Sequence, residues 1–355
     1  MFFEFLECAG ILLLVAFALA PAFKMKFWNI GGEGQILVGC LVTAGISKFM
    51  AGTSDVVVIL LCLVLSILAG IIWAVIPAIF KAFFNTNETL FTLMMNYIAI
   101  GLIALFINIW VPSGSQVFGR LTNAALPNLF GIKYTFNIIV VVVIVTLMIV
   151  YMKKTKHGYE LSVVGESVNT ARYVGINVKK VIIRTMVLSG AICGLVGFLL
   201  VAGHHHTLST GLADGRGFTG VLIAWLGGFQ PGQMILYAFL VAVFQCGSRH
   251  AASYMAMNST DFSAIVTGMF FLVVIASEFF VNYKIMLKKD NVQEPALVPA
   301  NGPVVEETVE DVPSVESTQI EELREEKVEE PKKKTTSKKS ENKKPAKKAS
   351  KKEAK

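Results

Sequence analysis

Charged residues are scarce in this sequence, and so are the usual signatures of catalysis. Only 16% of the 355 residues are charged, whereas 54% are hydrophobic, and the mean hydropathy is +0.62. Soluble globular domains carry about 25% charged residues, so this composition excludes an ordinary soluble fold. The sequence also lacks a Walker motif, an HExxH motif and a Ser, His and Asp order that fits a soluble hydrolase. We therefore predict a polytopic membrane protein that is not an enzyme by itself and uses no cofactor.

Cysteine is rare, and its spacing does not suit a metal site. The sequence has five cysteines, no CxxC pair and no spacing typical of zinc ligands. All of them lie inside apolar runs, so we expect small packing residues: Cys8, Cys40, Cys62, Cys193 and Cys246. The other metal candidate is His204–His206 with Asp214, but adjacent histidines rarely face one ion. We expect no metal there, and predict an extracytoplasmic loop that meets a partner protein or the mouth of a cavity.

Long apolar runs dominate the first 283 residues. About 20 apolar residues are needed to cross the hydrocarbon core of a bilayer. Six runs qualify, near residues 5–23, 56–80, 89–111, 134–152, 181–203 and 261–283. Three shorter runs fit short spans, broken helices or re-entrant segments: 35–50, 217–228 and 231–247. The predicted fold class is therefore all-α, a polytopic transmembrane helical bundle of about nine membrane segments.

Residues 153–184 form one long polar stretch between two apolar runs. Seven Lys and Arg residues stand there against two Glu residues. Short cytoplasmic loops are enriched in Lys and Arg, so we predict that this loop is cytoplasmic. Counting spans outward from it places Met1 outside the cell and the C-terminal tail inside. Glu4 and Glu7 then precede the first span, which is typical of a chain that lacks one upstream helix. A signal peptide is disfavoured, because it would begin with basic residues.

Within this loop, apolar residues recur at steps of three and four between Glu160 and Gly175. This period predicts a short amphipathic helix along the membrane surface, with an apolar face made of Leu161, Val164, Val168, Ala171 and Val174. We expect Gly165 to break the helix and Gly175 to stop it. Two interpretations of the apolar face stay open: docking to a partner protein, and packing against the cytoplasmic helix ends of the chain itself.

Polar side chains inside the apolar runs are the other functional candidates, because such groups are costly in a membrane. Glu88, Thr92 and Asn96 are four residues apart and so form a stripe on one helix. Contact with a polar substrate and hydrogen bonding between helices fit this stripe equally well. Asn29 and the segment Glu33–Gln35 lie among glycines at the start of a short apolar run. A phosphate-binding loop is excluded there because no Lys followed by Ser or Thr completes a Walker motif.

Beyond Tyr283 the composition changes. Several prolines precede an acidic block at 306–330 and a lysine-rich block at 332–355. Such a segment cannot bury a core. We therefore predict a transmembrane domain at 1–283 and a disordered, charged cytoplasmic tail at 284–355. The tail is interpreted either as a handle for anionic lipid, ribosomes or nucleic acid, or as a dispensable extension.

Three segments, in this order, resemble the motifs of a known family. Residues 27–35, FWNIGGEGQ, look like the FNIGxEGQ signature of these proteins. Residues 87–97, NETLFTLMMNY, are similar to the NE and TLMxNY span of the family. Residues 165–176, GESVNTARYVGI, resemble its GxNxxAARYxGI coupling loop. Over roughly residues 10–285 the chain resembles the permease subunit of bacterial ABC importers for nucleosides or simple sugars, in the branch related to ribose and branched-chain amino-acid permeases.

The resemblance implies a set of partners. They are an ABC ATPase subunit with two nucleotide-binding domains, a second permease subunit in a heterodimer, an extracytoplasmic substrate-binding lipoprotein, and the lipid of the bacterial plasma membrane; no nucleic acid is required. Family members carry a further hydrophobic segment before the FNIGxEGQ helix, and the charged tail is outside the family pattern. The alternatives are a branched-chain amino-acid ABC permease and a membrane scaffold that acts through its basic tail.

The resemblance also implies two groups of site residues. Those expected to couple the chain to the ATPase are Gly165, Glu166, Asn169, Ala171, Arg172, Tyr173 and Gly175. Those expected along the translocation path are Asn29, Glu33, Gln35, Glu88, Thr92, Asn96 and Phe218.

Overall fold

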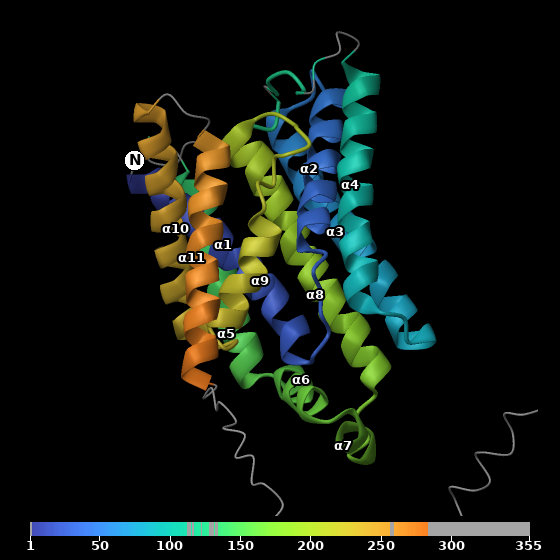
Figure 1. Ribbon diagram of the computed structural model, residues 1–355. Helices are drawn as coiled ribbons and strands as arrows, with labels where there is room; N and C mark the ends of the chain where they lie inside the picture. Colours follow the sequence, from blue (N-terminus) through green and yellow to red (C-terminus); the bar gives the residue numbers. More distant parts are fainter. Residues whose placement is uncertain are drawn as a thin grey trace, which may run out of the picture. The chain divides into compact units, whose positions relative to one another are not determined.

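The computed structural model of the chain is helical (Figure 1). It describes residues 2–111, 115, 117–121, 123–127, 131, 134–255 and 259–282. Over these residues the only β pairing is an isolated bridge between Val117 and Ser209. The all-α fold class is thus confirmed for this part of the chain, whereas the tail predicted at 284–355 lies outside it.

Over the described residues, eleven α-helices and one π-helical segment follow one another. They are α1 (Phe2–Lys24), α2 (Gly32–Phe49), α3 (Asp55–Phe84), α4 (Glu88–Trp110), α5 (Thr135–Lys154), α6 (Lys156–Glu166), α7 (Val168–Tyr173), α8 (Val178–Phe198), the π-helix η2 (Leu199–His205), α9 (Arg216–Leu226), α10 (Pro231–Tyr254) and α11 (Ser259–Asn282).

Six of these helices are long and apolar enough to cross a membrane. They are α1, α3, α4, α5, α8 continued by η2, and α10. The expectation that 231–247 is a short segment is wrong, because α10 has 24 residues. Its C-terminal turns contain Arg249 and His250, so the apolar run ends before the helix does. The run expected at 261–283 lies on α11, which has 24 residues.

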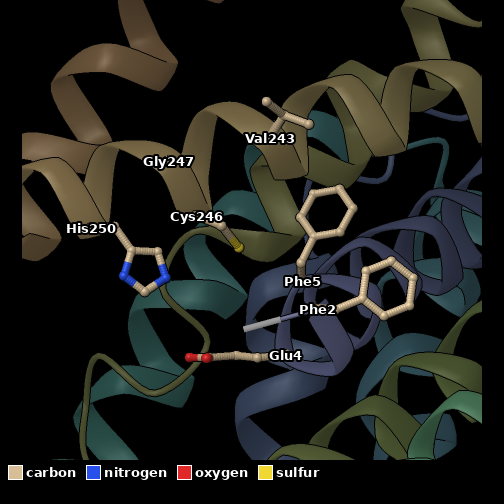
Figure 2. A pocket seen from close by; sticks show the side chains of 7 residues that line it. All are labelled: Phe2, Glu4, Phe5, Val243, Cys246, Gly247 and His250. Atoms are coloured by element: carbon tan, nitrogen blue, oxygen red, sulfur yellow. The ribbon is translucent and has the colours of Figure 1, made fainter.

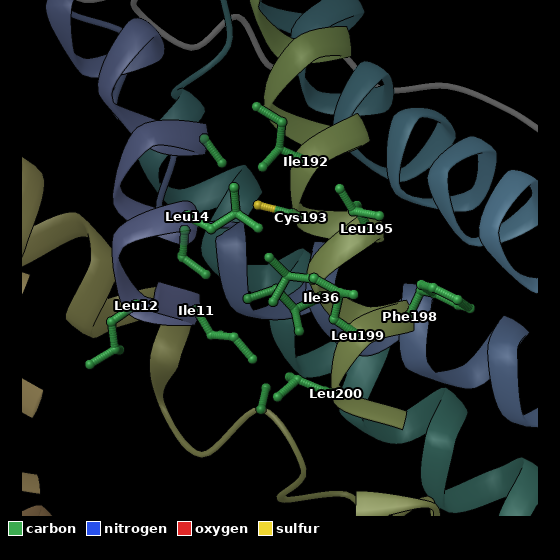
Figure 3. Close-up of a cluster of buried hydrophobic side chains, with 14 of the residues drawn as sticks. Ile11, Leu12, Leu14, Ile36, Ile192, Cys193, Leu195, Phe198, Leu199 and Leu200 are labelled. Carbon is green, nitrogen blue, oxygen red and sulfur yellow. The ribbon is translucent and has the colours of Figure 1, made fainter. Parts of the chain in front are cut away.

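Helices α1 and α8 lie at the centre of the packed helices. Of their most apolar stretches, 67% and 78% of the residues are buried, against 22–33% in α3, α4, α5 and α10. Figure 3 shows the contact between them: Ile11 and Leu14 of α1 and Ile36 of α2 face Ile192 and Leu199 in the α8 to η2 stretch. A helix that is hydrophobic all round is typical of such a central position.

Helix α3 packs closely against α8 through small residues. Its buried stripe includes Ser66, Gly70 and Ala74, whereas its large apolar side chains, such as Leu60, are exposed. A Cβ atom added at Gly70 would lie only 2.2 Å from the carbonyl oxygen of Gly190. Large side chains outward and small ones between helices are the arrangement expected in lipid, where close backbone approach drives helix association.

Candidate functional site

The chain between α1 and α2 is irregular although several of its residues are buried. Residues 25–31 form no helix, yet Met25, Phe27 and Asn29 are almost inaccessible to solvent. Irregular backbone is tolerated at membrane depth only where other groups satisfy its N–H and C=O groups. Several of the polar residues predicted to line the translocation path lie in this segment or bond to it, among them Asn29, Thr92 and Asn96.

Two side chains of α4 bond the irregular backbone directly. The Thr92 Oγ1 atom accepts a hydrogen bond from the Ile30 N–H at 3.2 Å. The Asn96 amide donates to the Ile30 carbonyl at 2.9 Å, and its Oδ1 atom accepts from the Gly34 N–H at 2.8 Å. Gly34 allows this approach, because a Cβ there would lie 2.9 Å from Asn96 Oδ1. Of the two interpretations of the stripe on α4, this geometry fits hydrogen bonding between helices.

A second set of bonds ties the same segment to α8. Asn29 Oδ1 accepts from the Gly31 N–H at 3.1 Å and from the Gln35 amide at 3.4 Å. The Asn29 amide donates to the Ser189 hydroxyl at 3.2 Å, and that hydroxyl donates to Gln35 Oε1 at 3.5 Å. Ser189 belongs to none of the predicted site residues, although its place beside two small residues in an apolar run was a usable signal.

Glu33, in the first turn of α2, holds the start of α9. Its two carboxylate oxygens accept hydrogen bonds from the backbone N–H groups of Gly215 at 2.9 Å and Gly217 at 2.7 Å. Gly215 is the N-cap residue of α9 and Gly217 lies in its first turn, where the peptide dipoles favour a negative charge. A Cβ atom at Gly217 would lie 2.3 Å from the Glu33 nitrogen, so only glycine permits this contact.

The structure therefore brings together five of the seven residues predicted for the translocation path: Asn29, Glu33, Gln35, Thr92 and Asn96. The side chain of Glu88 is paired instead with Lys81 at 2.8 Å. Phe218 lies on α9 and is partly exposed. A role of these residues in translocation stays a prediction.

A second buried polar cluster was not predicted. The carboxylate of Glu7 in α1 accepts from the Asn137 amide at 3.3 Å and pairs with His204 Nδ1 at 3.1 Å. The His204 ring also stacks on Tyr134 with 5.0 Å between the centroids. A lone carboxylate inside an apolar run was the signal for this cluster. Over the described residues, no group of three or more His, Cys, Asp or Glu side chains is arranged to hold a metal ion.

Beside this cluster lies a cavity of about 310 Å³, between the start of α1 and the second half of α10. Figure 2 shows Phe2 and Phe5 on its apolar side, with Glu4 and His250 as its polar side chains. The cavity is mostly apolar and contains none of the predicted site residues.

The polar loop forms two helices rather than the single amphipathic helix that was predicted. Ser167 separates them: its backbone is extended, and its hydroxyl accepts from the Thr170 N–H at 3.2 Å to cap α7. The predicted break at Gly165 is wrong, since this residue lies inside α6, where a Cβ atom would be 2.1 Å from the Lys24 carbonyl oxygen. Gly175 does end the segment, with a φ of +83° that favours glycine.

The predicted apolar face of this loop is divided between the two helices. Leu161, Val164 and Ala171 are buried against Met25 and Phe27 at the end of α1, the end of the bundle at which Figure 1 shows α6 and α7. Exposed residues cover the outer side of this region and define the outer surface of α7: Glu166, Val168, Asn169, Arg172, Tyr173 and Val174. Seven residues were predicted to couple to the ATPase. Four of them lie on this surface: Glu166, Asn169, Arg172 and Tyr173. Gly165 and Ala171 are buried beneath it, and Gly175 follows it in sequence.

His157 fixes the start of the same loop. It is buried in α6, and its Nδ1 atom contacts the Tyr151 hydroxyl. Burial lowers the pKa of His157 below its ordinary value, and the positive charge of Arg184 lowers it further. The imidazole is therefore neutral in the folded protein at neutral pH.

Comparison with known proteins identifies the family. The family described as branched-chain amino acid transport system / permease component matches residues 1–275. The chain belongs to this permease family. It is a multi-pass membrane protein, and the family predicted from the three sequence motifs is confirmed.

Three relatives illustrate the range of the family. The guanosine ABC transporter permease protein of Bacillus subtilis is 31% identical over 66% of this chain and 70% of its own length. The nucleoside ABC transporter permease protein of Lactococcus lactis is 28% identical over 69% of this chain and 71% of its own length. The glucose ABC transporter permease protein of Haloferax volcanii is 28% identical over 84% of this chain and 82% of its own length. No solved structure matches the chain.

Proposed function

We propose that the chain is the membrane-spanning permease subunit of an ATP-binding-cassette importer for nucleosides or simple sugars. The observation that carries this proposal is the similarity of more than 60% of the chain to permeases named for guanosine, nucleosides and glucose. These names favour nucleosides or sugars over a branched-chain amino acid. A scaffold that acts through its tail would leave the membrane part, which contains the family match over residues 1–275, without a role.

In this proposal the membrane domain has nine segments. Beyond the six long helices, three further segments complete it: residues 25–31 with α2, the chain before α9 with α9, and α11. The first two begin with irregular backbone, whereas α11 is a continuous helix of 24 residues. The bonds from Thr92, Asn96 and Glu33 support this arrangement, because an interrupted segment in a membrane needs partners for its freed backbone groups. The domain would occupy residues 1–283 of a bacterial plasma-membrane protein, with a cytoplasmic tail at 284–355.

The translocation path would lie between this chain and a second permease subunit. Broken helices whose ends meet inside the membrane are typical of substrate sites in transporters. Here the start of α2 meets the start of α9 through Glu33. The residues predicted for the path would then act mainly by holding these two helix ends, while Phe218 is free to face the solute.

The outer surface of α7 would dock into the ATPase subunit. Its exposed side chains are mixed in polarity, and Tyr173 is 92% exposed without a contact to explain an aromatic residue there. Exposed aromatic side chains often become the anchors of a protein interface. Gly165 and Ala171 would contribute indirectly, because their small size lets α6 and α7 pack closely against the end of α1.

The test replaces Tyr173 by Ala in the full-length chain. Loss of one aromatic anchor costs about 2 kcal/mol, or roughly 30-fold in affinity. We expect the ATPase to copurify poorly and substrate-stimulated ATP hydrolysis in liposomes to fall. The matched control is Tyr254→Ala, which removes a tyrosine that is 88% exposed at the C-terminal end of α10. Normal copurification and full coupling in Tyr173→Ala protein that reaches the membrane would contradict the proposed docking surface.

A further inference from the structure

Helices α9, α10 and α11 line a cavity that adjoins Glu33, since Gly215, whose N–H bonds Glu33, is among its lining residues. Its volume is about 210 Å³. Its lining includes Phe218 and Thr219 from α9, Gln245 and Arg249 from α10, and Ser263 and Thr267 from α11. Of the residues named as candidates in the sequence analysis, Asp214 and Phe218 belong to this lining.

Two buried side chains in the cavity have unused hydrogen-bonding atoms. Gln245 and Thr267 are each only 6% exposed, and neither Gln245 Oε1 nor Thr267 Oγ1 has a partner among the described residues. The neighbouring hydroxyls are satisfied, since Ser263 and Ser248 donate to the Gln245 carbonyl oxygen at 3.2 and 3.1 Å. Buried polar atoms are nearly always paired, so two unpaired atoms on side chains that line one cavity indicate a ligand that supplies the missing bonds.

The charges around the cavity point to a neutral ligand. Asp214 and Arg249, on its wall, form an ion pair with each other. This pair leaves no uncompensated charge to attract a carboxylate or an ammonium group. The Nε atom of Arg249 is also unpaired, so the wall presents a donor as well as two acceptor positions. A hydroxyl group satisfies both kinds of position because it donates and accepts.

We propose that this cavity binds the ring hydroxyls of a sugar moiety, either free or as part of a nucleoside, during its passage through the permease. This inference rests on the proposed function and adds the site at which the solute is recognised. A cavity of 210 Å³ is smaller than the 300 Å³ or more of ordinary ligand sites, so it suits one sugar ring. The base of a nucleoside would extend past the ring of Phe218, which is 41% exposed and offers a stacking surface.

An apolar amino-acid side chain would not fit this wall. It would leave the Gln245 and Thr267 oxygens buried and unpaired, and a site built for hydroxyls rejects analogues that lack them. The proposal therefore predicts discrimination by hydroxyl groups, which a merely structural role of these residues does not produce.

The experiment uses cells whose own copy of the gene is deleted and replaced by the full-length chain or a variant. Uptake of radiolabelled guanosine is compared with uptake of its dideoxy analogue, and uptake of glucose with that of a deoxyglucose. The variants are Gln245→Leu and Thr267→Val. The matched controls are Gln233→Leu at an exposed position of α10 and Thr146→Val at an exposed position of α5.

We expect each variant to lower uptake of the hydroxylated solute about 10-fold and to leave that of its deoxy analogue near the wild-type level. The controls keep wild-type discrimination. Thermal denaturation of the purified variants without solute should match the wild type, since each substitution removes an atom that had no partner.

The outcomes separate the two proposals. If the wild-type chain restores uptake but the variants lower both solutes equally, or lower neither, the cavity does not recognise hydroxyls and the inference falls while the proposed function stands. If the wild-type chain restores uptake of leucine and of none of the four sugar-containing solutes, both proposals fall. Thr267→Val is nearly isosteric, so it decides the question if Gln245→Leu does not reach the membrane.

Discussion

The carboxylate of Glu33 connects two helix starts that are more than 180 residues apart in sequence, and its replacement by Gln tests that connection. Each carboxylate oxygen accepts one backbone N–H at the start of α9, from Gly215 and Gly217. A glutamine keeps one acceptor oxygen and turns an NH₂ group toward the other N–H. One buried N–H then loses its partner, which costs about 1–3 kcal/mol, and the loss of charge at the helix start adds about 0.3–2 kcal/mol.

Part of this cost is offset because a buried charge no longer has to be desolvated. We therefore expect Glu33→Gln to destabilise the protein by about 2 kcal/mol, which corresponds to a melting temperature lower by about 5 °C. The assay is thermal denaturation of the detergent-solubilised full-length chain, followed by the loss of its monodisperse peak in size-exclusion chromatography.

The matched control is Glu88→Gln, which removes the charge of a carboxylate that pairs with the partly exposed Lys81. Both side chains of this pair are partly exposed, so the pair is weaker than a buried one, and its loss should lower the melting temperature less than the loss of the Glu33 carboxylate. If Glu33→Gln and Glu88→Gln melted within about 1 °C of each other, the bonds from Glu33 to α9 would not stabilise the fold as argued here.

Two further predictions concern the helix packing and the cytoplasmic loop. A Cβ atom at Gly194 would lie 2.3 Å from the Ser66 carbonyl oxygen, so Gly194→Val should separate α3 from α8 and destabilise the protein by about 3 kcal/mol; Gly101→Val, into open space on α4, should be tolerated, and equal melting of the two would refute the close contact. For His157, burial lowers the folded pKa, so the unfolded chain binds the proton more tightly and stability should fall as the pH drops through about 6.5. Melting at about pH 7.5 and 5.5 should show a larger difference in the wild type than in His157→Gln, and identical differences would remove His157 as the cause.

Much of the architecture follows from local sequence. The scarcity of charge and the long apolar runs are sufficient to predict a helical membrane protein, because a bilayer leaves the backbone few other ways to satisfy its hydrogen bonds. The stop at Gly175 was also readable, since glycine is the residue that adopts a positive φ after a helix without strain. The three motifs were sufficient to identify the family.

Predictions from periodicity were less reliable where two elements meet. The pattern from Leu161 to Val174 suggested one amphipathic helix, but Ser167 caps a second one, and α6 turns its apolar side to the end of α1. A period of three to four residues records which side chains are apolar. It does not record what they will be buried against, because the partner surface comes from distant parts of the chain.

The sequence by itself determined which residues are polar inside the membrane, and only the tertiary structure decided what they do. Asn29, Thr92 and Asn96 were candidates for substrate contact or for hydrogen bonding between helices, and the structure directs them to the irregular backbone at residues 25–31. Likewise, only the structure shows that Gln245 Oε1 and Thr267 Oγ1 are buried without a hydrogen-bond partner among the described residues. The physical reason is that a hydrogen bond depends on distance and angle in space, whereas the sequence specifies only the donor or the acceptor.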